Sequence, residues 1–198
     1  MKFLAFVDLH ADKQQLKSLL ELANQDDIEF VICAGDISQF GSGLRMVLDK
    51  FNAIKKPFYI IPGNHEDDEM MTAVSKEYTY IHNFHQKVFK IQDYVLLGHG
   101  EGGFSKEDSN FRKIARDWYG QYNGQKIIFV THGPPYRTKV DKVGNNYVGN
   151  IDYRKFIERI KPKLVICGHI HETAGKEDFI GETKVVNPGW KGMILELE

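Results

Sequence analysis

The chain has 198 residues, of which 42% are hydrophobic and 27% are charged, and its formal net charge is −1. This composition predicts a single globular domain over residues 1–198, and the near-neutral charge argues against a nucleic-acid partner. No stretch is long and apolar enough to predict a signal peptide or a membrane-spanning helix, so we expect no membrane partner. The two cysteines, Cys33 and Cys167, lie in apolar runs, which favours buried reduced thiols and a cytoplasmic location.

Short apolar runs alternate with amphipathic segments along the chain. The runs are rich in β-branched and aromatic residues on consecutive positions, as strands buried on both faces require: 2–7, 30–34, 58–61, 127–131 and 163–167. Apolar residues recur at helical spacing in three other segments: 12–25, 43–54 and 151–162. This order predicts an α/β fold with a mostly parallel sheet and helical crossovers.

Three further segments depart from this alternation. Residues 80–98 and 173–197 predict short strands joined by tight turns, which would form a second sheet or an antiparallel extension packed on the first. Residues 105–120 predict a surface helix. We interpret His82 and His85, within the first of these segments, as ordinary surface residues.

Polar side chains follow each of the five apolar runs, where the predicted strand ends. They are Asp8 and His10, Asp36 after Gly35, Asn64 and His65 after Gly63, His132, and His169 and His171 after Gly168. The carboxyl ends of parallel strands lie along one edge of a sheet, so we expect these side chains to converge. Each motif alone is ordinary, because Asp caps helices and Gly-Asp or Gly-Asn forms turns. Their repetition at five strand ends predicts a common functional site.

Asp, Asn and His donors without cysteine favour divalent transition metals such as Mn²⁺, Fe²⁺, Zn²⁺, Ni²⁺ or Co²⁺, and we favour Mn²⁺. Several histidines argue against a dedicated Ca²⁺ or Mg²⁺ site. The candidate ligands are too many for one ion with an open position, and they suit two ions that share a carboxylate: Asp8, His10, Asp36, Asn64, His132, His169 and His171. Two such ions promote displacement at phosphorus, with a bridging hydroxide as the nucleophile. No serine-nucleophile elbow or P-loop motif is present.

In order and separation, these motifs resemble the signature of the calcineurin-like metallophosphoesterases. Residues 185–189, VVNPG, are similar to the small bacterial and archaeal members. The resemblance implies an αββα sandwich of two mixed β-sheets flanked by helices. It also implies two ligand sets bridged by one carboxylate: Asp8, His10, Asp36 and His171 for one metal, and Asp36, Asn64, His132 and His169 for the other.

The resemblance further implies that His65 is not a ligand but a general acid for the leaving-group oxygen. Its neighbour Glu66 is expected to orient or charge-stabilise the imidazole. The predicted enzyme hydrolyses a small-molecule phosphoester, and we slightly favour a phosphodiester over a phosphomonoester because a general acid assists a poor leaving group. The alternative is a non-catalytic metal-binding scaffold or interaction protein of the same fold, against which the presence of His65 argues.

Two residues outside the motifs are candidate substrate contacts. His99 lies in a glycine-rich loop after an apolar run, where a flexible loop residue is the competing interpretation. Arg137 follows THGPPY and would suit bidentate contact with phosphate, and a solvated surface arginine is the alternative. The sequence leaves the oligomeric state open, with a homodimer as one option.

Overall fold

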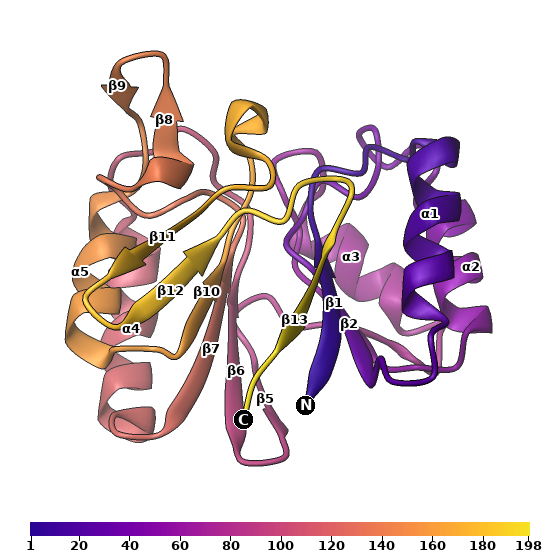
Figure 1. Cartoon of the computed structure of the whole chain (residues 1–198), viewed down its shortest axis with the longest axis horizontal. Helices are drawn as coiled ribbons and strands as arrows, with labels where there is room; N and C mark the ends of the chain where they lie inside the picture. The colour runs from indigo at the N-terminus through magenta and orange to yellow at the C-terminus, as the bar shows by residue number, and fades with distance from the viewer.

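The computed structural model describes residues 1–198 as two β-sheets packed face to face, with helices on both outer sides (Figure 1). The first sheet contains, in spatial order, β13 (Met193–Glu196), β1 (Lys2–Phe6), β2 (Phe30–Cys33), β3 (Phe58–Ile60) and β4 (Ile81–Asn83). The second contains β11 (Glu177–Ile180), β12 (Thr183–Val186), β10 (Leu164–Ile166), β7 (Lys126–Thr131), β6 (Tyr94–His99) and β5 (Val88–Ile91). The predicted αββα sandwich of two mixed sheets is confirmed.

Five helices cover the outer faces of the two sheets (Figure 1). The first sheet is covered by α1 (Lys13–Ala23), α2 (Leu44–Ala53) and α3 (Asp68–Ser75). The second is covered by α4 (Ser109–Tyr122) and α5 (Ile151–Ile160). A small hairpin, β8 (Lys142–Val143) and β9 (Asn146–Tyr147), extends from the loop between β7 and α5. No helix combines the length and apolar composition that crossing a membrane requires.

Three apolar layers hold the sandwich together. Successive residues of β1 alternate between two of them: Leu4 and Phe6 pack under the first group of helices, whereas Phe3 and Ala5 pack between the sheets. The third layer, around Phe129, lies between the second sheet and α4 and α5. Each fully buried phenylalanine contributes about 1.5–3 kcal/mol of burial free energy. Burial on both faces is the physical reason for the consecutive apolar positions in the sequence.

The five predicted strands form, but they belong to different sheets. The first three, β1 to β3, lie in the first sheet, and β7 and β10 lie in the second. The expectation of one parallel sheet holding all five is therefore wrong, because an apolar run shows that a strand is buried and not which partner it pairs with. The C-terminal segment also divides, since β11 and β12 extend the second sheet while β13 pairs antiparallel with β1.

Candidate metal centre

The polar strand ends of both sheets meet at one end of the sandwich. The loops after β1, β2 and β3 of the first sheet approach those after β7 and β10 of the second (Figure 1). A hydrogen-bond-range contact joins His10 to His171, which are 161 positions apart, and another joins Asn64 to His132. The predicted convergence is thus present, although it is formed between two sheets and not along the edge of one.

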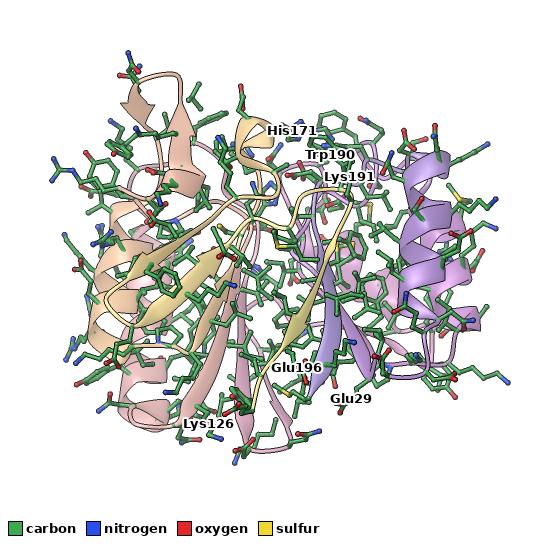
Figure 2. All side chains as sticks on the ribbon, viewed as in Figure 1. Glu29, Lys126, His171, Trp190, Lys191 and Glu196 are labelled. Carbon is green, nitrogen blue, oxygen red and sulfur yellow. The ribbon has the colours of Figure 1, made fainter.

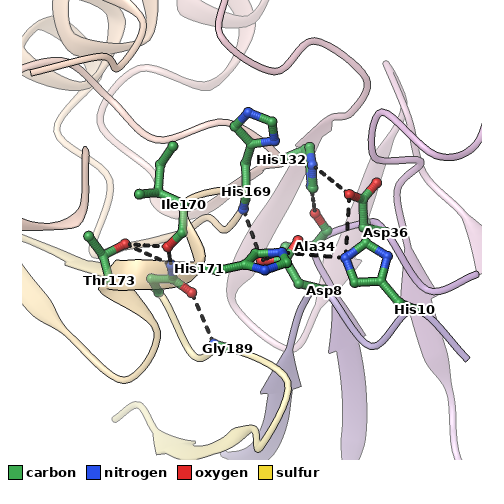
Figure 3. Close-up of polar contacts among 12 residues, drawn as sticks. Asp8, His10, Ala34, Asp36, His132, His169, Ile170, His171, Thr173 and Gly189 are labelled. Atoms are coloured by element: carbon green, nitrogen blue, oxygen red, sulfur yellow. Dashed lines mark hydrogen bonds and ion pairs between the residues drawn. The ribbon is translucent and has the colours of Figure 1, made fainter. Parts of the chain in front are cut away.

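Asp36 is the carboxylate around which the imidazoles gather (Figure 3). Its Oδ2 lies 3.5 Å from His132 Nε2 and 4.0 Å from His10 Nε2. The same oxygen lies 3.9 Å from His65 Nε2. Its Oδ1 accepts a hydrogen bond from the backbone N–H of His65 at 2.9 Å. Burial alone would raise the pKa of Asp36, but the hydrogen bond and charge of His132, with help from His65, lower that pKa to about 2. The carboxylate is therefore ionised at neutral pH.

Asp8, His10 and His171 form one group of donors beside Asp36. Their ligand atoms lie within 4.8 Å of one another, and the Nε2 atoms of the two histidines face each other at 3.4 Å. Asp8 Oδ2 accepts a hydrogen bond from the backbone N–H of His169, whereas its Oδ1 is buried without a partner. Burial, chiefly, lowers the pKa of His10, which keeps the imidazole neutral as a metal ligand must be. Facing nitrogens and an unpaired carboxylate oxygen fit a cation here.

A second group of donors lies on the other side of Asp36. His132 Nδ1 is 2.9 Å from the carbonyl oxygen of Ala34, which only accepts, so Nδ1 carries a proton. Its Nε2 then faces Asn64 Oδ1 at 2.9 Å as well as the Asp36 carboxylate. The lone pairs of His132 Nε2, Asn64 Oδ1 and the Asp36 carboxylate would repel one another without a cation between them. That cation is either a proton on Nε2 or a metal ion. Burial would lower the pKa of His132, but Asp36 raises it above its ordinary value, which reflects the same demand.

His169 completes this second group. Its ring centroid lies 5.2 Å from that of His132, and its buried Nε2 has no hydrogen-bond partner. A Cβ placed on Gly103 would come within 3.6 Å of this nitrogen and 3.9 Å of Asn64 Oδ1, so the two atoms border the same space. Burial first, and the charge of His132 second, lower the pKa of His169 to about 4. A neutral, unpaired imidazole beside an amide oxygen also fits a metal ion.

The backbone of the centre is strained where the proposed ligands are. Four of the seven candidate ligands have positive φ angles: Asp8 at 56°, His10 at 49°, Asp36 at 50° and His169 at 69°. Left-handed conformations of non-glycine residues cost about 1–3 kcal/mol each and cluster at functional sites. The glycine of the Gly-His-x-His motif, Gly168, is required by close packing, because a Cβ there would lie 2.2 Å from Val7 Cγ2.

His65 lies beside this centre with 19% of its side chain exposed. One ring nitrogen of His65, one of His10 and a carboxylate oxygen of Asp36 lie within 4.8 Å of one another, so His65 could also reach a metal ion held by the other two. Glu66 does not orient it. The Glu66 carboxylate is buried and accepts hydrogen bonds from the N–H and hydroxyl of Ser38 and from the N–H of Gly63. The expectation that Glu66 orients His65 is wrong, because the oxygens of Glu66 accept hydrogen bonds from Ser38 and Gly63 and so join two loops.

No hydrogen bond, ion pair or ring contact joins the remaining predicted residues to the seven candidate ligands. His99 is 3% exposed at the end of β6, with its Nε2 2.9 Å from Asp108 Oδ2. His85 is also buried, and its Nδ1 accepts a hydrogen bond from Gly100 N–H, so its interpretation as a surface residue is wrong. Arg137 is exposed, and its guanidinium lies 6.0 Å from the ring centroid of Tyr136. Substrate contact by His99 or Arg137 stays a prediction.

Sequence reasoning missed three aromatic residues that each contact a different histidine of the centre. The rings pair at these centroid distances: Phe40 with His65 at 4.0 Å, Phe104 with His169 at 4.4 Å, and Trp190 with His171 at 5.8 Å. Phe40 is 75% exposed and Phe104 is 63% exposed. Large exposed aromatic residues in glycine-rich loops between motif segments are the signal by which the two phenylalanines could have been found.

The calcineurin-like phosphoesterase family model matches residues 1–173. The chain belongs to this family. A probable glycerophosphodiester phosphodiesterase GpdQ of Arcobacter nitrofigilis is 23% identical over 183 residues, a match that covers 85% of this chain and 65% of the relative. A probable cyclic nucleotide phosphodiesterase of Coxiella burnetii is 25% identical over 173 residues, covering 82% of this chain and 67% of that protein.

The fold is shared with solved structures at lower identity. The crystal structure of TT1561 of Thermus thermophilus has a TM-score of 0.77 and 17% identity, covering 96% of this chain and 90% of that one. Membership of a metal-dependent hydrolase family agrees with the Asp and His cluster built above. This chain spans about two thirds of the length of the Arcobacter relative.

Proposed function

We propose that this protein is a dinuclear metal-dependent phosphoesterase that acts on a small phosphodiester. The observation that carries the proposal is the position of Asp36, an ionised carboxylate between two groups of donors that each call for a cation. Asp8, His10 and His171 would hold one ion, Asn64, His132 and His169 the other, and Asp36 both. When bound, two divalent ions lower the pKa of water and neutralise charge at phosphorus. The Asp, Asn and His donors suit first-row divalent transition metals, and among these we propose Mn²⁺.

His65 would give a proton to the leaving alcohol. Its Nδ1 is buried without a partner, and its ring is fixed between Phe40 and His10 at centroid distances of 4.0 Å and 4.6 Å. A general acid is of most use for a poor alkoxide leaving group, which supports a diester of an ordinary alcohol over an activated ester. The phosphodiesterase names of the Arcobacter and Coxiella relatives support a diester over a monoester as the substrate. Two buried, unpaired cysteines support a cytoplasmic location.

The experiment is metal removal and reconstitution. We expect chelated protein to lose hydrolysis of bis(p-nitrophenyl) phosphate and p-nitrophenyl phosphate, and to regain both with about two equivalents of metal, best with Mn²⁺ and faster on the diester. Fe²⁺, Zn²⁺, Ni²⁺ and Co²⁺ serve as the comparison ions. Full activity after exhaustive metal removal would refute the mechanism. Two bound ions with no hydrolysis of any phosphoester would favour the scaffold alternative.

A further inference from the structure

A depression beside the metal centre is lined partly by residues that the proposed mechanism leaves without a role. Its volume is about 260 Å³. Its lining comes from the end of β1, the start of α1, and two later loops: Asp8, Leu9, His10, Asp12, Gln15, His171 and Trp190. Three of these are the proposed ligands of one ion. Any ester whose phosphorus reaches that ion therefore has this depression next to it.

Trp190 forms one wall of the depression and is held in a defined position. Its ring is inclined at 61° to that of His171, and Figure 2 shows Trp190 and His171 at the same end of the molecule. The preceding Gly189 donates its N–H to Asn187 Oδ1 at 3.0 Å and accepts from Val7 N–H at 3.1 Å. Gly189 has a φ of 62°, and a Cβ there would lie 2.6 Å from Ala174 Cβ. The turn that carries the indole is thus hydrogen-bonded to the segment after β1 that carries Asp8.

Gln15, in the first turns of α1, supplies a polar group to the same depression. Its backbone N–H donates to Asp12 Oδ1 as part of the helix cap, and its side-chain amide makes no hydrogen bond. Asp12 Oδ1 is occupied by this cap through Gln14 and Gln15. The depression therefore offers one flat aromatic surface, one free amide, which both donates and accepts hydrogen bonds, and the second oxygen of the Asp12 carboxylate, which accepts hydrogen bonds only.

We propose that this depression binds a planar heteroaromatic group of the substrate, a nucleobase, stacked on Trp190 with its polar edge at Gln15. The inference rests on the proposed function, because the metal centre has to hold the phosphorus of the same ester. An indole face suits any base, and a glutamine amide matches the paired donor and acceptor on an adenine edge. A glycerol-type alcohol has no flat face for the indole.

The kinetic test uses two cyclic phosphodiesters with the same reacting centre. Adenosine 2′,3′-cyclic phosphate carries the base, and methyl ribofuranoside 2,3-cyclic phosphate carries a methoxy group in its place. We expect the Mn²⁺-loaded enzyme to prefer the adenosine ester, and Trp190→Ala to lower kcat/KM by about 5- to 100-fold for that ester alone. Gln15→Ala, which suits a helix, should lower it less. Phe179→Ala, which removes a 57% exposed aromatic on β11, is the matched control and should change neither rate.

The binding test is independent of turnover and of any folding defect in the alanine variant. Trp118 is 4% exposed in the core, so Trp190 is the tryptophan that a ligand reaches. We expect adenosine 5′-monophosphate to quench the fluorescence of the metal-loaded protein saturably, ribose 5-phosphate not to do so, and the quenching to vanish in Trp190→Phe.

Equal quenching by both ligands, persistence of quenching in Trp190→Phe, or equal loss on both esters in Trp190→Ala would overturn the inference. If the enzyme hydrolyses both esters alike, without quenching by the nucleotide, this inference fails and the proposed function stands. If no metal-dependent hydrolysis of any phosphoester occurs, the proposed function fails, and the quenching still decides whether a base binds at Trp190.

Discussion

Replacing Gly63 by alanine tests how closely the centre is packed around Asp36. A Cβ at this position would lie 2.1 Å from Asp36 Oδ1 and 2.4 Å from the Asp36 backbone nitrogen, whereas ordinary contacts begin near 3.4 Å. The Asp36 carboxylate or its loop therefore has to move by about 1.3 Å, the difference between the first distance and the ordinary one. Metal–ligand distances tolerate changes of only roughly 0.2 Å. We expect Gly63→Ala to lose most of its bound metal and its activity.

The magnitudes follow from the same contact. Overpacking of this kind lowers the free energy of unfolding by about 1–3 kcal/mol, and the loss of metal affinity should reach at least about 10- to 100-fold. Elemental analysis after dialysis against limiting Mn²⁺ measures the metal, and urea unfolding in a chelator measures the stability. Gly120→Ala is the matched control, because its Cβ would have no neighbour within 4 Å. A Gly63→Ala protein with full metal stoichiometry and wild-type turnover would show that the packing argument is wrong.

Three other predictions concern Asp36, His65 and His85. Asp36→Asn should bind neither metal ion at full occupancy in elemental analysis, because one carboxylate serves both; two retained ions would exclude bridging. His65→Gln should keep its metals and lose roughly 10²–10⁴-fold in turnover on an alkyl diester, with a smaller loss on a nitrophenyl ester; metal loss would instead make His65 a ligand. Burial, with the His99 charge second, lowers the pKa of His85 to about 4, so the unfolded chain binds a proton that the folded chain does not between pH 6.5 and 4. His85 should therefore contribute about 2–3 kcal/mol to the fall in the free energy of unfolding in chelator over this window, and His169, whose pKa is also lowered to about 4, adds to the fall. His85→Asn should make the fall smaller by the His85 contribution; an unchanged slope would contradict the assignment.

The local sequence was enough to predict several strands and helices of this protein and the residues of its candidate site. The apolar runs predicted β1, β2, β3, β7 and β10, because burial on both faces leaves no position for a polar side chain. Apolar residues at helical spacing predicted α1, α2 and α5, because one face of each helix is buried against a sheet. The Asp, Asn and His residues that follow the strands were readable as a common site, since the chain direction alone places each of them at a carboxyl end. Their agreement in position and donor chemistry was a property of the sequence.

Other features depended on contacts between residues far apart in the chain. Periodicity does not encode the strand partner, so only the tertiary structure assigned β7 and β10 to a second sheet and returned β13 to β1. His85 and His99 looked like surface and loop residues, yet both are buried, because the packing of neighbouring elements sets their exposure.

The depression between Gln15 and Trp190 joins residues 175 positions apart, and no local pattern marks either as a wall of one cavity. The local sequence indicates the secondary structure of each segment and which of its faces are buried. Which segments meet one another is decided by the packing of the whole chain, which here brings an indole and an amide beside the proposed metal ligands.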